Sequence, residues 1–197
     1  MKEIIIATKN NGKAKEFHDF FSAYGIQASS LLDLTGDIPD VEETGASFAE
    51  NAALKAEQIS ELLQVSVLAD DSGLEIDALH GEPGIYSARY AGESKNDQAN
   101  IDKVLMKLNG VPVAKRIARF ICVLAVATQG KETTFYRGVC EGFITTKQKG
   151  NNGFGYDPIF SPLNRGMTMA ELTASEKSQI SHRKNAIIKL DDWIKTL

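Results

Sequence analysis

The chain has 197 residues, a formal net charge of −4 and 43% hydrophobic residues. This balance is typical of a globular protein with a buried core and excludes a disordered chain. No apolar stretch has the length of a membrane span or a signal peptide, and both cysteines, Cys122 and Cys140, lie in strand-like apolar surroundings. We therefore expect reduced thiols and a cytoplasmic protein without membrane or nucleic-acid partners, because nucleic-acid binding normally requires a basic face.

The first seventy residues alternate apolar runs with amphipathic segments. The expected elements are a strand over 3–8, a helix over 12–24, a strand over 26–32, a helix over 47–63 and a strand over 65–69. Ser47 and Glu50 form a capping-box pattern at the start of the second helix. Asp70 and Asp71 follow the last strand, so we expect their carboxylates at a strand end.

The second half of the chain continues this alternation. The expected elements are a half-exposed strand over 74–79, a helix over 97–108, strands over 118–127 and 132–145, and a final helix capped by Ser181. Gln129 and Gly130 separate the two long strands, as in a hairpin. Strands that alternate with helices predict a mixed α/β fold, and residues 1–197 show no obvious linker that would divide them into separate domains.

The segment between the first strand and the first helix is a candidate phosphate site. Helix N-termini at the carboxyl ends of strands bind anions through unpaired N–H groups. The residues of this segment are Thr8, Lys9, Asn10, Asn11, Gly12 and Lys13. The glycine spacing of a P-loop is absent. A turn with solvated lysines explains the same residues equally well.

Two pairs of acids and, more weakly, Glu50 are candidate ligands for a cation. Glu42-Glu43 lies in an irregular acidic loop, and Asp70-Asp71 follows an apolar run. Carboxylate oxygens suit Mg²⁺, and a neighbouring carboxylate can deprotonate a water molecule. Helix caps or solvated turns account for most such pairs, and the spacing alone does not decide between the two interpretations.

A glycine-rich loop near the C-terminus is a candidate base site. An aromatic side chain among glycines can stack on a nucleobase, and downstream cationic side chains can bind a keto oxygen or a phosphate. The residues concerned are Phe154, Gly155, Tyr156, Asp157, Lys177, His182 and Arg183. The alternative is that the aromatic residues pack the loop onto the sheet and that His182 and Arg183 are surface residues near a helix cap.

These segments together resemble the Ham1 family of inosine/xanthosine triphosphate pyrophosphatases over essentially the whole chain. The matching strings, in order, are Thr8-Lys-Asn-Asn-Gly-Lys13, Glu42-Glu-Thr-Gly45, Ser47-Phe-Ala-Glu-Asn-Ala52 with Lys55, Leu68-Ala-Asp-Asp-Ser-Gly-Leu74, Pro83-Gly-Ile-Tyr-Ser-Ala-Arg-Tyr90, Gly153-Phe-Gly-Tyr-Asp-Pro158, Ala170-Glu-Leu172 and Ser181-His-Arg183. One variation is Lys9, where many relatives have glycine. So many collinear strings make chance agreement implausible.

The resemblance implies an elongated mixed sheet flanked by helices, with two lobes, a central nucleotide-binding cleft and a homodimer. It also implies Mg²⁺-dependent hydrolysis of ITP, dITP and XTP to the monophosphate and pyrophosphate. Asp71 would be the catalytic carboxylate, and Glu43 and Asp71 would hold Mg²⁺. Segment 8–13 would bind the triphosphate and Ser72 would contact the nucleotide. The remaining pocket would consist of Phe154, Gly155, Tyr156, Asp157, Lys177, His182 and Arg183.

Two other functions fit parts of the sequence. A Maf-like pyrophosphatase would act on pyrimidine or modified nucleotides, but the strings Gly153–Asp157 and Ser181–Arg183 argue against it. A regulatory module that binds a nucleotide without hydrolysing it is opposed by the intact set of acids.

Overall fold

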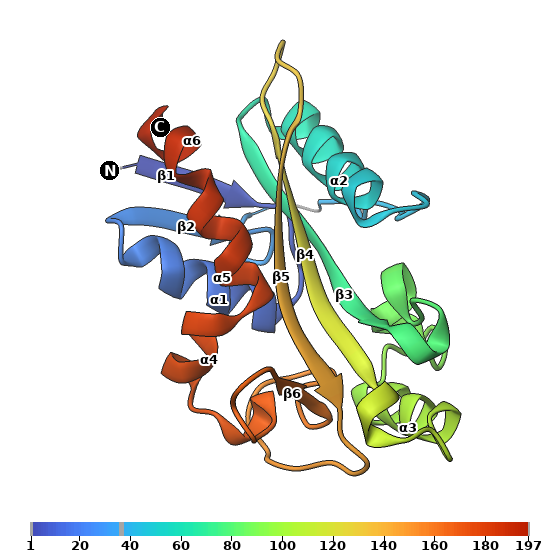
Figure 1. The fold of residues 1–197 in the computed structure, drawn as a ribbon. Coiled ribbons are helices and arrows are strands. Elements are labelled where there is room, and N and C mark those ends of the chain that lie inside the picture. The colour runs from blue at the N-terminus through green and yellow to red at the C-terminus, as the bar shows by residue number, and fades with distance from the viewer. Residues whose placement is uncertain (1, 36–37, 197) are drawn as a thin grey trace. The chain divides into compact units, whose positions relative to one another are not determined.

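A computed structural model describes residues 2–35 and 38–196 and shows an α/β fold built on one six-stranded mixed sheet (Figure 1). The strands are β1 (Lys2–Ile6), β2 (Ile26–Ser30), β3 (Val67–Ile76), β4 (Ile117–Ala127), β5 (Thr134–Ile144) and β6 (Phe160–Pro162). Their order in the sheet is β2-β1-β3-β4-β5-β6. This arrangement confirms the predicted fold class.

The sheet is mixed because its two edges pair differently. β1 runs parallel to β2, with Ile4 opposite Ala28, and parallel to β3, with Ile6 opposite Leu68. At the other edge β6 pairs antiparallel with β5 through Phe143 and Ser161. The polar stretch after Ala69 was predicted to end a strand, but this prediction is wrong, because β3 continues without interruption to Ile76.

Six α-helices accompany the strands in the described part of the chain. They are α1 (Asn11–Ser22), α2 (Phe48–Leu63), α3 (Asp97–Lys107), α4 (Ala174–Ile180), α5 (His182–Ile187) and α6 (Asp191–Thr196). Ser47 caps α2, since its side chain accepts a hydrogen bond from the Glu50 amide. Ser181 accepts from the Lys184 amide at the start of α5, as predicted. The sequence did not predict α4 or β6.

The chain forms two compact units, each made from separate stretches of sequence. The first comprises residues 1–71, 122–137 and 186–197, and the second comprises residues 72–121 and 138–185. The boundary in β3 falls between Asp71 and Ser72.

The first unit has helices on both faces of its part of the sheet. Successive side chains of a strand point to opposite faces, and the two buried clusters follow this rule. One cluster joins Ile4, Ile6 and Leu68 to Phe17 of α1 and to the C-terminal helices. The other cluster joins alternate strand residues, such as Ala69, to α2. Each face of β3 is therefore covered by its own helix.

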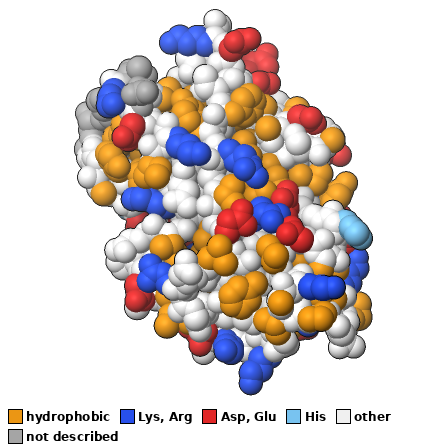
Figure 2. Space-filling view, viewed as in Figure 1, with side chains coloured by type: hydrophobic (Ala, Val, Ile, Leu, Met, Phe, Trp, Pro, Cys, Tyr) orange, Lys and Arg blue, Asp and Glu red, His pale blue; other side chains and the backbone are white. Residues whose placement is uncertain are grey.

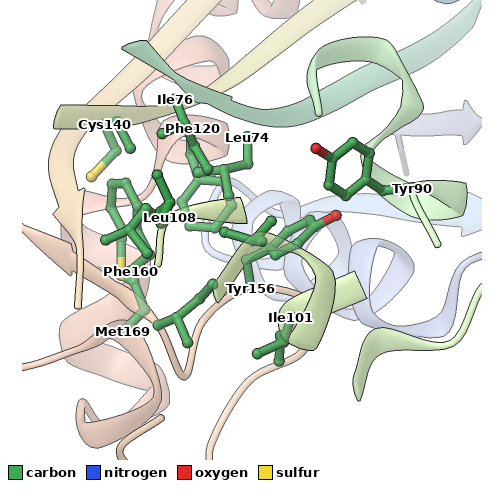
Figure 3. Packing of buried hydrophobic residues seen from close by; sticks show 14 of the residues in the cluster. Leu74, Ile76, Tyr90, Ile101, Leu108, Phe120, Cys140, Tyr156, Phe160 and Met169 are labelled. Atoms are coloured by element: carbon green, nitrogen blue, oxygen red, sulfur yellow. The ribbon is translucent and has the colours of Figure 1, made fainter. Parts of the chain in front are cut away.

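The second unit has a single buried cluster, which Figure 3 shows from close by. It brings Leu74 and Ile76 of β3 together with Ile101 of α3, Phe160 of β6 and Tyr156 of the glycine-rich loop. All five side chains are at most 5% exposed. Burial of these apolar side chains in one cluster holds the glycine-rich loop against β3, α3 and β6.

Candidate functional site

Two acid–lysine pairs lie on adjacent residues of β3 in the first unit. Asp70 Oδ2 is 2.9 Å from the ammonium of Lys13, which belongs to α1. Asp71 Oδ1 is 3.8 Å from the ammonium of Lys55, which belongs to α2. Because adjacent strand residues point to opposite faces, each buried acid faces a lysine from the helix on its own side.

The ammonium of Lys55 also binds a carboxylate from the acidic loop. Its Nζ lies 2.6 Å from Glu43 Oε1, and both side chains are largely buried. Glu43 and Asp71 are separated in sequence by the whole of α2, yet they contact one ammonium group. The neighbouring Glu42 is exposed.

Asn51 fixes the orientation of the Asp71 carboxylate. Its Nδ2 donates to Asp71 Oδ2 over 3.2 Å, while its Oδ1 accepts from the Gly45 amide over 2.8 Å. The Gly45 amide can only donate, so the Asn51 carboxamide must turn its NH₂ group toward Asp71. Asn51 is fully buried, which holds this arrangement in place.

Burial raises the pKa of the Asp71 carboxyl to about 6, although the positive charges of Lys55 and Lys13 oppose the rise. For Lys55, burial alone would lower the pKa, but the charges of Asp71, Asp70 and Glu43 hold the pKa above its ordinary value. Lys55 is therefore a cation beside a carboxyl group whose pKa is about 6. A carboxylate with such a pKa can accept a proton from water.

Residues of the segment 8–13 form the start of α1. The Asn10 side chain accepts from the Lys13 amide as the N-cap, and Thr8 Oγ1 accepts from the Asn10 amide over 3.2 Å. Gly12 lies within the first turn of α1 and Asn11 is exposed. The ammonium of Lys9 turns instead to residues 38–40, where it contacts the Ile38 carbonyl at 2.7 Å and Asp40 at 2.8 Å.

Glu43 and Asp71 offer carboxylate oxygens, the kind of donor that a hard cation prefers. Within residues 2–35 and 38–196, no group of three or more His, Cys, Asp or Glu side chains forms a ready-made metal site. Mg²⁺ needs only one or two protein carboxylates, because water and substrate phosphates complete its shell. Glu43 and Asp71, which share one ammonium, could supply those two carboxylates.

The second unit contains a separate set of buried charged side chains. Lys177 Nζ lies 2.7 Å from Asp157 Oδ2 and 4.5 Å from the centroid of the Phe154 ring. The Arg183 guanidinium donates to Ser72 Oγ over 3.1 Å. These contacts connect α4 to the glycine-rich loop and α5 to Ser72 within the second unit.

The aromatic and imidazole rings of this set differ in exposure. Phe154 is half-buried, whereas Tyr156 is 5% exposed and belongs to the hydrophobic cluster (Figure 3). The imidazole of His182 stacks on Phe120 with 5.0 Å between ring centroids. The packing interpretation therefore describes Tyr156, and Phe154 is the aromatic side chain with an accessible surface.

Sequence reasoning placed neither Asn51 nor Lys55 among the site residues. The two are four residues apart on α2, so they lie on the same face of that helix. An asparagine is uncommon at a buried position in a helix, because its amide needs partners. A polar Asn51 among the apolar positions of α2, four residues before Lys55, could have indicated that both belong to the site.

The described residues thus combine a mixed α/β sheet that carries two buried acid–lysine pairs on β3 with a second set of buried charged side chains around the glycine-rich loop. The chain matches the Ham1 family over residues 4–193 and belongs to that family.

Individual relatives extend this match over the full length. The chain is 64% identical over 197 residues to a protein of Oceanobacillus iheyensis named dITP/XTP pyrophosphatase, covering 100% of both chains. It is 56% identical over 192 residues to a Geobacillus kaustophilus protein of the same name, covering 98% of this chain and 94% of that one. The solved structure of the Staphylococcus aureus Ham1 protein superposes with a TM-score of 0.87 at 47% identity, covering 99% of each chain.

The distribution of charge on one face and the character of the helices complete the description. On the face shown in Figure 2, Lys and Arg side chains are scattered among acidic and apolar ones and do not gather in one patch. Across the described ranges, no helix combines the length and apolar character needed to cross a membrane.

Proposed function

We propose that the chain hydrolyses ITP, dITP and XTP to the nucleoside monophosphate and pyrophosphate. The observation that carries this proposal is that Lys55 contacts both Glu43 and Asp71 and Asn51 donates to Asp71, next to the Asp70–Lys13 pair on β3. The name of both relatives, dITP/XTP pyrophosphatase, indicates the same substrates. The family match and the named relatives give no support to a Maf-like enzyme.

In this proposal Asp71 accepts a proton from the attacking water. The water oxygen forms a bond to phosphorus while one of the P–O bonds that link the α- and β-phosphates breaks, and pyrophosphate leaves. Asn51 orients Asp71 by its hydrogen bond to Oδ2. Lys13 and Lys55 stabilise the negative charge that develops on the phosphate oxygens.

We propose Mg²⁺ as the cofactor, held by Glu43 and Asp71. When bound, it neutralises charge on the phosphate oxygens and orients the triphosphate. The ammonium of Lys55 separates these carboxylates and so limits their mutual repulsion. Depletion of Mg²⁺ with EDTA should abolish turnover, and added Mg²⁺ should restore it.

Base recognition is assigned to the second unit. Phe154 offers a ring face for stacking, and His182 and Arg183 offer donors to the 6-keto oxygen, a position where adenine carries an amine. The N–H groups of Phe154, Gly155 and Asp157 already donate to protein acceptors. The candidate donors to the base are therefore His182, Arg183 and the backbone N–H of Tyr156.

The test is a panel of initial rates on ITP, dITP, XTP, GTP, ATP and dTTP, with both products identified. The proposal expects pyrophosphate and monophosphate from the first three substrates and much lower kcat/KM for the others. Preference for dTTP would favour the Maf-like alternative. Binding without metal-dependent pyrophosphate release would indicate a regulatory module.

Two further parts of the proposal concern assembly and location. We propose a homodimer and a cytoplasmic protein, as the family resemblance implies. Sedimentation at several protein concentrations tests the first, and fractionation of cells of the source organism tests the second.

A further inference from the structure

The segment from Pro83 to Asp97 has no role in the proposed chemistry, yet it binds the loop 153–157. The Tyr156 hydroxyl donates to the Ser87 carbonyl over 2.8 Å, and this bond is buried. The Asp97 carboxylate accepts from the Gly155 amide over 2.7 Å. Two consecutive residues of the loop are therefore held by one segment of the chain.

Ser87 also binds β3 close to Ser72. Its hydroxyl accepts from the Leu74 amide over 2.9 Å and donates to the Gly84 carbonyl over 2.6 Å. Ser87 is 7% exposed, so these bonds are shielded from water. Through its side chain and its carbonyl, Ser87 thus joins the strand that carries Ser72 to the loop that carries Phe154.

The contacts of Tyr156 explain why its hydroxyl needs such a partner. Its ring lies among the apolar side chains of the second unit (Figure 3), where an unpaired hydroxyl would be costly. The Ser87 carbonyl satisfies the hydroxyl and fixes the ring. Since Tyr156 is two residues from Phe154, any shift of the ring moves the stacking surface.

Asp97 has no need to serve as the cap of its own helix. Asn96 already occupies the N-cap of α3, and its side chain accepts from the Ala99 amide. The next turn is held by Asn100, whose side chain binds the Ala91 amide and the Ala88 carbonyl. A firmly held helix start therefore presents the Asp97 carboxylate to Gly155.

We infer that Ser87 and Asp97 are positioning residues for base specificity, holding the loop 153–157 so that Phe154 meets the purine in one orientation. This inference rests on the proposed function. Binding energy from a base depends on accurate placement of stacking and hydrogen-bonding groups, and loss of the anchors loosens that placement without removing any group that contacts the ligand.

Three substitutions test the inference: Ser87→Ala, Tyr156→Phe and Asp97→Ala. Ser87→Ala removes the two bonds that hold Ser87 in place but keeps its carbonyl, whereas Tyr156→Phe and Asp97→Ala each remove one bond to the loop. Each variant should raise KM for ITP and lower the ITP/ATP ratio of kcat/KM by about fivefold, the order of effect of a lost hydrogen bond, while kcat on ITP changes little. Inhibition by inorganic tripolyphosphate, which lacks a base, should be unchanged. Asp97→Asn should restore the ratio, since its amide oxygen can accept from Gly155.

Matched controls come from the same elements. Asp102→Ala removes an exposed acid of α3 that binds Gln98, and Tyr86→Phe removes an exposed hydroxyl of the same segment as Ser87. Both controls should retain the parental ITP/ATP ratio. Asp97 is at the surface, so Asp97→Ala should fold even if the buried variants do not.

The possible results separate this inference from the proposed function. An active parent with unchanged ratios in all folded variants would overturn the inference alone. Equal losses of kcat/KM on ITP and ATP, together with weaker inhibition by tripolyphosphate, would show that Ser87 and Asp97 have a general structural role. That result would also overturn the inference. A parent that does not hydrolyse ITP would overturn the proposed function and the inference with it.

Discussion

The Asn51 carboxamide donates a 3.2 Å hydrogen bond to Asp71 Oδ2. The same side chain is held by the Gly45 amide, so a residue of the acidic loop indirectly sets the orientation of a strand carboxylate. The other oxygen, Oδ1, is left on the side of Lys55. This relationship gives the two oxygens of Asp71 different environments.

We expect Asn51→Ala to lower kcat about tenfold with a small change in KM, because Asp71 loses the donor that orients it. Pyrophosphate release under saturating ITP measures the effect. Asn51→Asp is the matched variant. It places a second carboxylate beside Asp71, which should raise the pKa of Asp71 and move the acidic limb of the pH–rate profile to higher pH. An unshifted pH–rate profile in Asn51→Asp would argue against direct contact between residue 51 and Asp71, the proposed general base.

Asp71→Asn should keep the fold and lose about 10²- to 10⁴-fold in kcat, the usual contribution of a general base. The substitution keeps the size of the side chain and removes its proton-accepting oxygen. Circular dichroism and thermal unfolding check the fold, and product analysis checks turnover. Near-parental turnover would remove Asp71 from the reaction.

The pH dependence of stability should carry a contribution from Asp71. Burial raises the pKa of this carboxyl from 3.8 to about 6 in the folded protein. The folded chain therefore retains a proton that the unfolded chain releases near pH 4. The contribution to the free energy of unfolding is full below pH 4 and declines as pH rises through 6, by at most about 3 kcal/mol.

Urea unfolding in EDTA at pH 4.5 and 7.5 measures this contribution. The parent should lose more stability than Asp71→Asn between the two pH values, because the asparagine does not titrate. Parallel curves for the two proteins would contradict the raised pKa.

Gly153→Ala should destabilise the protein more than Gly155→Ala. Both glycines have positive φ, 79° and 59°, so both substitutions introduce backbone strain of about 1 kcal/mol. Only at Gly153 would the new Cβ meet a neighbour, the Asp157 carboxylate at 1.9 Å. That carboxylate also accepts from Lys177, so the clash disturbs a buried ion pair. Equal Tm values for the two variants would show that the loop adjusts freely.

His182→Ala should reduce the preference for ITP over ATP, because it removes a candidate donor to the keto oxygen. The ring is held against Phe120, so its loss should also lower stability modestly. The ratio of kcat/KM values for the two substrates is the measurement. An unchanged ratio would place base reading on Arg183 or another group.

The fold could be predicted largely from local patterns, since α2 begins after Ser47 and ends at Leu63 as the capping residue and the apolar spacing indicate. The course of β3 could not. Two buried acids interrupt its apolar run, and they are compatible with a strand only because Lys13 and Lys55 compensate them. Those lysines are distant in sequence, and local periodicity contains no information about them.

In the candidate site, too, some residues could be predicted from the sequence and others could not. The residues of both acid pairs could be named from composition and order, but their partners could not. Asn51 acts through contacts with Gly45 and Asp71 that depend on how α2 packs against β3. Likewise, only the packed structure shows that Tyr156 lies in the hydrophobic cluster while Phe154 keeps an accessible face.

The Lys13–Asp70 pair has a consequence for attempts to engineer heat resistance. Asp70 is 1% exposed, and a buried ion pair is often no more stable than a well-packed apolar pair of similar volume. Directed evolution that rewards survival at high temperature alone would tend to replace both residues with methionine or leucine. Such variants would lack the Lys13 ammonium that the proposed mechanism uses, so each round would have to screen turnover together with thermal tolerance.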